Sequence, residues 1–288
     1  MQRANLVVAA LLVTGTLACV TPAHAQVTIG ADLGAFSSYV WRGITYTNKF
    51  VLQPDAYVTV PVSSASLTAG GWFNIEPGSY NGATDISENG SDGAGLAEFD
   101  WWGEVGVPVG SQTTLTAGVT GYTFPNNDGF TKAANTVEIY GKAAFDVLLA
   151  PKLAVWYDVD KIKGAYFEGS ISHSVAAGPK ATIVLGALAG LSAGQGIPSD
   201  PLSTESFNFT DDGFTHLDLS AGVPFTAGPL SFAPALHFVI TGDEATKFTK
   251  KDPASPTGLN SNDVKLWGGV TISWSKELGA APAEPETK

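Results

Sequence analysis

The sequence predicts an all-β protein, a single transmembrane antiparallel β-barrel of about 12 strands. Three observations predict this fold class. Apolar and polar residues alternate with a period of two along segment after segment, the connections between these segments alternate between short and long, and an export signal opens the chain. A soluble β-sandwich would show the same alternation, so the period alone does not separate the two classes.

An export signal is predicted over residues 1–25. Arg3 gives it a positive start, residues 6–20 form an apolar core, and Ala23-His24-Ala25 is a cleavage site of small residues. The core is shorter than the ~20 residues of a spanning helix, and Cys19 lacks the aliphatic residue that usually precedes a lipid-attachment cysteine. We therefore expect a cleaved signal peptide over 1–25, an outer-membrane barrel over 26–275 and a disordered tail over 276–288.

Charge and cysteine content exclude several kinds of partner and chemistry. The chain has 27 acidic and 15 basic residues, a formal net charge of −12, so nucleic acid is not an expected partner. Its only cysteine, Cys19, lies in the predicted signal, which leaves the mature chain without a disulfide, a thiolate metal site or a cysteine nucleophile. We expect neither a cofactor nor a metal ion.

Each predicted strand is bounded by glycine, proline, asparagine, aspartate or serine. Most strands have about the ~10 residues that a tilted strand needs to cross an outer membrane. From the second strand onward, tight turns at one end alternate with longer connections at the other, except for a short connection around Lys161. This arrangement is typical of a Gram-negative outer-membrane barrel with both termini on the periplasmic side. The predicted strands cover residues 27–41, 53–62, 67–76, 97–108, 113–124, 136–147, 153–160, 165–176, 181–192, 213–224, 229–241 and 264–275.

The two faces of the predicted strands differ in chemistry. In the fourth strand Glu98, Asp100 and Glu104 alternate with Phe99 and Trp101. We expect the acidic face to line the lumen, because a charge facing lipid at the midplane costs ~2–4 kcal/mol for a basic side chain and less for an acidic one. Aromatic residues gather near the strand ends beside the longer connections, which favours a membrane girdle over ordinary core aromatics.

Two sequence motifs favour an outer-membrane barrel over other β-proteins. The last strand reads Gly269-Val270-Thr271-Ile272-Ser273-Trp274, which is similar to the terminal signal recognised by the barrel-assembly machinery, although a tail follows it here. Ser38-Tyr39-Val40-Trp41-Arg42-Gly43-Ile44 resembles the Tyr-x-x-Arg-Gly-Ile opening of TorF-like porins. The resemblance covers the signal, the N-terminal hairpin formed by the first two predicted strands (27–41 and 53–62) and the general strand pattern. It implies an outer-membrane barrel of loosely defined channel function, with no catalytic residues.

Inward-facing charged residues are the candidates for a selectivity site. Carboxylates outnumber basic side chains among them, which favours cations at a constriction. Interior hydrogen bonds and ion pairs of a closed barrel are an equally good explanation, and for Arg42 we favour an ion-pair or loop-anchoring role over contact with a solute. We expect weak cation selectivity to depend on Glu98, Asp100 and Glu104. The candidates are Glu98, Asp100, Glu104, Glu138, Lys142, Asp158, Asp218 and Arg42.

Histidines supply a second polar cluster. A turn at Thr226 would place His237 directly opposite His216 on the neighbouring strand. A metal or pH-sensitive site there is a minor alternative, because imidazole pairs titrate near neutrality. Ser220 shares the face of His216, but the two lie roughly 13 Å apart along the strand, too far for a nucleophile to hydrogen bond its base.

These features predict passive diffusion of ions or small hydrophilic solutes across the outer membrane, with a preference for cations and no catalysis. The alternatives are a barrel enzyme acting on lipid or peptide, and a structural or adhesive barrel without transport. The expected partners are outer-membrane lipid, the barrel-assembly machinery and the permeating solutes or ions. The solute, the oligomeric state and whether the lumen is open or plugged are left open by the sequence.

Overall fold

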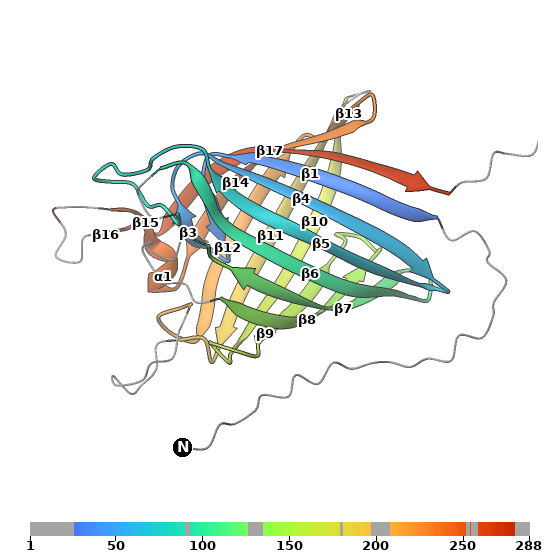
Figure 1. The fold of residues 1–288 in the computed structure, drawn as a ribbon, viewed down its shortest axis with the longest axis horizontal. Helices are drawn as coiled ribbons and strands as arrows, with labels where there is room; N and C mark the ends of the chain where they lie inside the picture. Colours follow the sequence, from blue (N-terminus) through green and yellow to red (C-terminus); the bar gives the residue numbers. More distant parts are fainter. Residues whose placement is uncertain are drawn as a thin grey trace, which may run out of the picture.

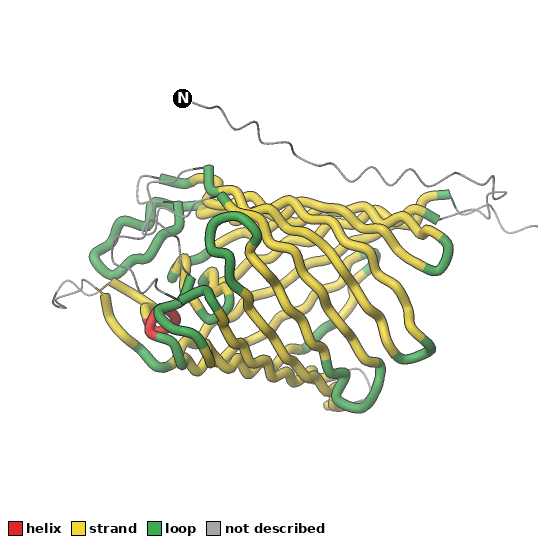
Figure 2. Tube along the Cα trace, turned by 90° about the horizontal axis from the view of Figure 1, so that it is seen from below, coloured by secondary structure: helices red, strands yellow, loops and turns green. Residues whose placement is uncertain are grey.

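The computed structural model describes residues 26–89, 93–125, 135–178, 181–196, 208–251, 254 and 259–279. Within these residues the chain forms one closed antiparallel β-barrel (Figures 1 and 2). The predicted signal over 1–25 and residues 280–288 of the predicted tail lie outside the described part of the chain. The twelve barrel strands are β1 (Val27–Phe36), β4 (Val51–Val62), β5 (Ala65–Glu76), β6 (Gly95–Val109), β7 (Thr113–Thr123), β8 (Thr136–Phe145), β9 (Lys152–Asp158), β10 (Ala165–Gly178), β11 (Ala181–Ala193), β12 (Gly213–Gly222) with its continuation β13 (Phe225–Ala227), β14 (Leu230–Thr241) and β17 (Val264–Leu278).

Hydrogen-bonded pairing runs around the whole ring. Each strand pairs with the next one along the chain, and β17 returns to β1, with Val27 opposite Leu278 and Phe36 opposite Gly269. A closed ladder leaves no strand edge unpaired, which is the condition for β-structure in hydrocarbon. The predicted fold class, a 12-strand antiparallel barrel, is confirmed.

The outer face of the barrel is apolar and the inner face is polar. Large apolar side chains point outward and stay exposed, among them Trp101, Ile139 and Leu266. Glu98 and Glu138, on the opposite face of β6 and β8, are buried inside the barrel. Period-two alternation produces both faces at once, because successive side chains of a strand point to opposite sides.

The two ends of the barrel differ as the connections predict. Tight turns lie at the end where β1 begins and β17 stops, which we call the turn end (Figure 1). The longer connections gather at the opposite, loop end and include the short helix α1 (Glu244–Lys247) and the strands β15 (Phe248–Lys251) and β16 (Leu259–Ser261). No helix in the described ranges is long and apolar enough to cross a membrane.

The end of the first strand and the end of the last strand differ from the prediction. The first strand was expected to reach residue 41, but β1 stops at Phe36 and a separate hairpin follows, made of β2 (Tyr39–Trp41) and β3 (Ile44–Thr47). The last strand was expected to end at residue 275, but β17 continues to Leu278, where Lys276 and Glu277 still pair with Ile29 and Thr28. Backbone pairing with β1 therefore extends the ladder into the predicted tail.

Candidate functional site

The β2–β3 hairpin lies inside the barrel at the loop end. Its turn consists of Arg42 and Gly43, both with positive φ, 50° and 84°. Two such residues between paired strands form the tight turn whose twist matches a hairpin, and Trp41 lies opposite Ile44 across it. Arg42 is not a glycine, so the left-handed conformation costs it about 1–2 kcal/mol that other contacts must offset.

Gly43 is required by a close approach as well as by its φ. A Cβ atom on Gly43 would lie 2.7 Å from Cγ of His216, whose side chain belongs to β12 on the barrel wall. No larger residue fits there without moving the hairpin or His216. The glycine therefore lets the tip of the hairpin rest directly against the wall.

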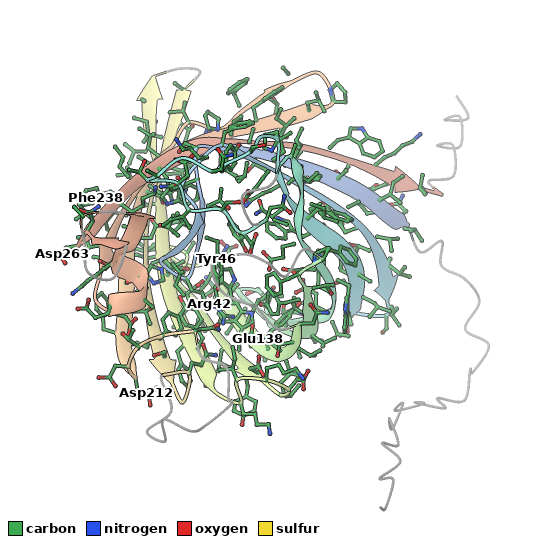
Figure 3. All side chains as sticks on the ribbon, turned by 60° about the vertical axis from the view of Figure 1, so that its left-hand side comes forward. Arg42, Tyr46, Glu138, Asp212, Phe238 and Asp263 are labelled. Atoms are coloured by element: carbon green, nitrogen blue, oxygen red, sulfur yellow. The ribbon has the colours of Figure 1, made fainter. Side chains whose placement is uncertain are left out.

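Arg42 reaches from the hairpin across the lumen and pairs with Glu138 on β8. Around the barrel, β8 lies five strands away from β1, the strand that leads into the hairpin. The two terminal nitrogens of Arg42 donate to the two carboxylate oxygens at 2.8 and 2.7 Å, and Tyr122 donates to Oε2 of the same carboxylate at 2.8 Å. Only 6% of the Arg42 side chain and 1% of that of Glu138 are exposed. Figure 3 shows both residues, with Tyr46, inside the ring of strands.

Aromatic rings surround the guanidinium of Arg42. Its central carbon lies 4.1 Å from the ring centre of Trp41, 4.3 Å from that of Tyr166 and 5.2 Å from that of Trp156. Arginine over aromatic faces gains an electrostatic attraction that grows when water is excluded. The paired charge is therefore held by contacts from the hairpin and from two barrel strands.

Further hydrogen bonds fix the two strands of the hairpin to the wall. Tyr39 donates to Glu98 on β6 at 2.8 Å, and Thr47 donates to Glu76 on β5. Asn48, just after the hairpin, donates to the backbone oxygen of Thr84 and accepts from the backbone nitrogen of Ile86, both in the β5–β6 connection. The hairpin is thus tied to that connection as well as to the barrel.

Other connections cover the hairpin at the loop end. Asn74 on β5 donates to Glu88 at 2.7 Å, and burial together with the nearby charge of Glu98 raises the pKa of Glu88 above its usual range. Phe209, in the β11–β12 connection, is fully buried and stacks on Tyr166. Helix α1 and strand β15 lie against β3. The lumen is therefore filled at the loop end.

The structure divides the predicted selectivity residues into separate groups. Glu98 and Asp100 are 3% and 8% exposed, because they lie beneath the hairpin. Glu104 and Lys142 lie nearer the turn end and form an ion pair of 3.1 Å, with 26% and 41% of their side chains exposed. Asp158 has another role: its carboxylate accepts from Thr136 and from three backbone nitrogens in the short β9–β10 connection.

The predicted pairing of the two histidines is wrong. His237 lies opposite Ser220, and His216 lies opposite Thr241, because the tight turn follows Ala227, which pairs with Leu230. The centre of the turn is therefore at residues 228–229, inside the predicted turn over 226–229 but in a different register. In the described part of the chain, no group of three or more histidine, cysteine or acidic residues could hold a metal ion.

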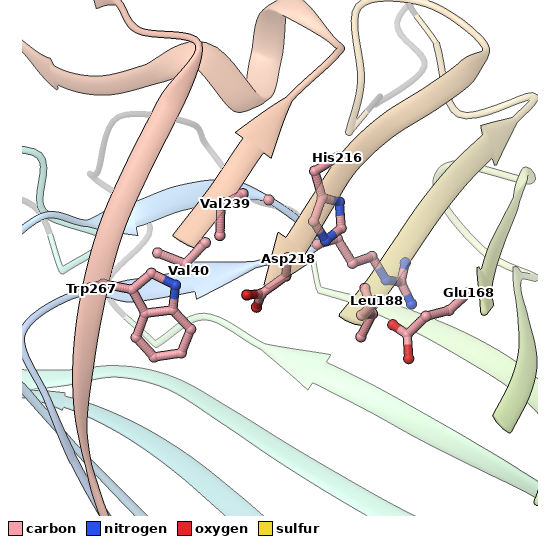
Figure 4. A pocket seen from close by; sticks show the side chains of 9 residues that line it. Val40, Glu168, Leu188, His216, Asp218, Val239 and Trp267 are labelled. Carbon is pink, nitrogen blue, oxygen red and sulfur yellow. The ribbon is translucent and has the colours of Figure 1, made fainter. Parts of the chain in front are cut away.

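His237 instead joins a chain of contacts with Asp218 and Trp267. Its Nδ1 lies 2.9 Å from Oδ2 of Asp218, and its ring stacks on that of Trp267 with centres 4.1 Å apart. Beside these residues, beneath the hairpin, is a cavity of about 150 Å³ (Figure 4). It is lined by Val40, Arg42, Gly43, Glu168, Leu188, His216, Asp218, Val239 and Trp267.

Sequence reasoning missed the hairpin as a separate unit and missed Trp267 as a site residue. A signal for the hairpin exists, because an x-Gly pair between short runs of aromatic and β-branched residues is a hairpin signature. Continuous alternation over residues 27–41 concealed it. Trp267 carries no comparable signal, since its neighbours come from strands distant in the sequence.

No family model and no curated protein matches the chain. An outer-membrane channel from Pseudomonas putida F1 superposes with a TM-score of 0.50 at 10% identity, covering 89% of this chain and 97% of that one. The fold is that of an outer-membrane β-barrel. LpxR from Salmonella typhimurium aligns over 86% of this chain and 99% of its own, with a TM-score of 0.47 at 6% identity. Identities this low show the fold alone.

Proposed function

We propose that this barrel is an outer-membrane channel for ions or small hydrophilic solutes, closed at the loop end by the β2–β3 hairpin. A contrast in exposure carries the proposal. Glu104 and Lys142 point inward and are 26% and 41% exposed, whereas Arg42 and Glu138 are 6% and 1% exposed. Inward side chains that remain wet indicate a water-filled lumen toward the turn end, which stops at the hairpin.

The hairpin is suited to movement because side chains hold it. Within the described residues, β2 and β3 pair with each other and with no barrel strand, so releasing them would leave the barrel ladder intact. The ties described above are individual hydrogen bonds, one ion pair and the contacts of Arg42 with the rings of Trp156 and Tyr166. A channel that opens by release of this hairpin follows from that arrangement.

Cation preference is part of the proposal. Arg42 is neutralised by Glu138 and Lys142 by Glu104, and the lumen wall also carries the carboxylates of Glu168 and Asp218. A narrow lumen brings these carboxylates closer to a passing ion than the ~8 Å Debye length at physiological salt, so screening does not remove their effect. An acidic wall favours cations.

The proposal gives a physical reason for the residues of the motif that resembles TorF-like porins. Three residues of the motif have a defined task in the hairpin: Tyr39 binds Glu98, Arg42 binds Glu138, and Gly43 allows contact with His216. We propose membership of that group, placement in the outer membrane and the absence of enzymatic activity. Ser220 lies opposite His237, but its Oγ is directed at Gly186 on β11, and no hydrogen bond joins it to His237 within the described residues.

The test is current through the purified barrel in a planar bilayer under a salt gradient. We expect small, infrequent currents for the wild-type protein, larger ones once the hairpin is released, and a reversal potential of the sign expected for cations. A variant with a released hairpin that remains silent would overturn the channel proposal. A preference for anions would overturn the cation assignment alone.

A further inference from the structure

Three carboxyl groups meet beneath the β2–β3 hairpin, at the point where Tyr39 binds the barrel wall. Glu98 and Asp100 belong to β6, and Glu88 comes from the β5–β6 connection. The carboxyl groups of Glu88 and Asp100 each lie within hydrogen-bonding reach of that of Glu98. Asn74, which lies opposite Glu98 in the β5–β6 ladder, donates to Oε2 of Glu88 and holds it there. We call Glu88, Glu98 and Asp100 the carboxyl cluster.

Among the described residues, no ion pair joins the carboxyl cluster to a cation. Arg42, the charged residue of the hairpin turn, is bound through two hydrogen bonds to Glu138 instead. Oε1 of Glu88 and Oδ1 of Asp100 are buried and accept no hydrogen bond from a described residue. Adjacent buried carboxyl groups without a cation cannot all carry a charge, so the members of such a group share protons.

Other titratable groups face the carboxyl cluster, and they are engaged with partners of their own. Arg42 and Glu138 neutralise each other, and Glu76 accepts from Thr47 and from the backbone nitrogen of Glu88. The tyrosines stay neutral, because a phenol ionises only near pH ~10. These groups are Tyr39 on β2, Arg42 in the hairpin turn, Tyr46 on β3, Glu76 on β5, Tyr122 on β7 and Glu138 on β8.

Release of the hairpin changes the number of protons that the carboxyl cluster binds. While docked, the hairpin keeps Glu98 and Asp100 buried, and burial with the nearby charge of Glu98 raises the pKa of Glu88. Once released, the same groups meet water and ionise as ordinary carboxyl groups do, near pH ~4. The docked state therefore binds more protons. Docking has its full strength below the ordinary carboxyl pKa and weakens as the pH rises through the raised pKa of Glu88.

We infer that the carboxyl cluster is a proton-dependent switch, which keeps the β2–β3 hairpin docked in acid and favours its release as the pH rises. In acid, shared protons join the three carboxyl groups, and Tyr39 ties the hairpin to Glu98. At higher pH the carboxylates repel one another and gain hydration when the hairpin leaves. Each proton lost on release lowers the ratio of docked to released hairpin about tenfold per pH unit. The inference rests on the proposed channel and gives the signal that opens it.

His216 contacts the hairpin from the other side of the barrel, and control by this residue would give the opposite response. Its strand, β12, lies half-way around the ring from β6. Its ring lies against Gly43, and its Nδ1 lies 3.0 Å from the hydroxyl oxygen of Thr215. A proton gained by His216 in acid would add a positive charge near Arg42 and weaken docking. The direction of the pH response therefore separates the two mechanisms.

The experiment measures the labelling of a cysteine in the hairpin at different pH values, with the full barrel in detergent. Thr45→Cys, on β3, reacts with a bulky maleimide when the hairpin is released. Ser111→Cys, in the exposed β6–β7 turn, corrects for the effect of pH on the thiol itself. Both carry Cys19→Ser. Between about pH 5 and about pH 8, the labelling rate at position 45 relative to position 111 should rise about tenfold or more.

A double variant tests whether the carboxyl cluster causes this response. Glu88→Gln with Asp100→Asn keeps the shape of the side chains and leaves Glu98 as the only carboxyl group of the cluster. The relative labelling rate should then stay nearly constant with pH. Glu88→Gln alone, in the connection outside the barrel wall, should reduce the response. Asp55→Asn is the matched control, because Asp55 faces Asp32 across the β1–β4 ladder in a carboxyl pair outside the cluster, and it should respond like the wild type.

Three results would overturn the inference. They are a relative labelling rate that does not change with pH, one that rises in acid, and a wild-type pH response in both the single and the double variant. The shift in gel mobility on boiling shows that each variant is a folded barrel. Because labelling requires no current, failure of the switch is distinct from failure of the channel proposal.

Discussion

Replacing Glu138 with glutamine is expected to release the β2–β3 hairpin from the lumen. Glutamine keeps the shape of the side chain but removes the charge that Arg42 meets with two hydrogen bonds of 2.8 and 2.7 Å. The pair is buried, with 6% and 1% of the side chains exposed, and removing one partner of such a pair costs about 3–5 kcal/mol. At 1.4 kcal/mol per tenfold change, the ratio of docked to released hairpin should fall by roughly a hundredfold to a few thousandfold.

Cysteine labelling measures this ratio directly. Thr45, on β3, is 4% exposed and its hydroxyl has no hydrogen-bond partner among the described residues, so Thr45→Cys removes none of the bonds seen there. In a Cys19→Ser background, this cysteine would be the only one in the chain. A bulky, water-soluble maleimide should label it slowly in the otherwise wild-type barrel and much faster in Glu138→Gln, and channel currents should increase in parallel.

Glu104→Gln is the matched control for Glu138→Gln. It breaks a second ion pair of the lumen wall, with Lys142, but 26% and 41% of those side chains are exposed. Exposed pairs contribute about 0–1 kcal/mol, so labelling at position 45 should change little. If Glu138→Gln left the labelling rate unchanged while the barrel still shifted its gel mobility on boiling, the ion pair would not be what holds the hairpin.

Four further predictions concern the closed hairpin, the lumen and the barrel. Gly43→Ala should also speed labelling, because its Cβ meets the ring of His216 at a φ of +84°; unaltered labelling would contradict the close packing. Glu104→Gln should reduce cation selectivity, seen as a shift in reversal potential; no shift would remove this carboxylate from the ion pathway. Deleting Gly279 onward should leave membrane assembly intact because β17 ends at Leu278, whereas Trp274→Ala should impair it; loss of assembly on truncation would mislocate the terminal signal. The barrel should fractionate with the outer membrane and migrate differently before and after boiling; recovery from the soluble fraction would contradict the membrane assignment.

Replacing each of the three carboxylates that were predicted to set selectivity is now expected to have a different effect. Only Glu104 lies on the wet part of the wall, whereas Glu98 binds Tyr39 and Asp100 lies buried beneath the hairpin. Glu98→Gln should therefore act on the docking of the hairpin before it acts on ion selectivity. Labelling at position 45 and reversal potential, measured on the same variant, separate the two effects.

The sequence by itself determined the strands, their faces and the two unlike ends of the barrel. These properties are local: alternation places Glu98 and Trp101 on opposite faces wherever the strand lies, and turn residues end each strand. An ion-pair or anchoring role for Arg42 was predicted from the sequence, but its place in the lumen is decided by the β2–β3 hairpin, because β1 stops at Phe36 and its alternation does not continue to residue 42. Its partner, Glu138, lies 96 residues away in the chain.

Only the tertiary structure decided which lumen residues meet water and which meet one another. Whether an inward carboxylate is wet depends on what fills the ring beside it, and the hairpin covers Glu98 while leaving Glu104 open. Register is equally non-local at the histidines, because the placement of one turn sets His237 opposite Ser220 instead of His216. Periodicity fixes the side of a strand on which a residue lies, whereas its neighbour across the ladder depends on the exact length of each turn.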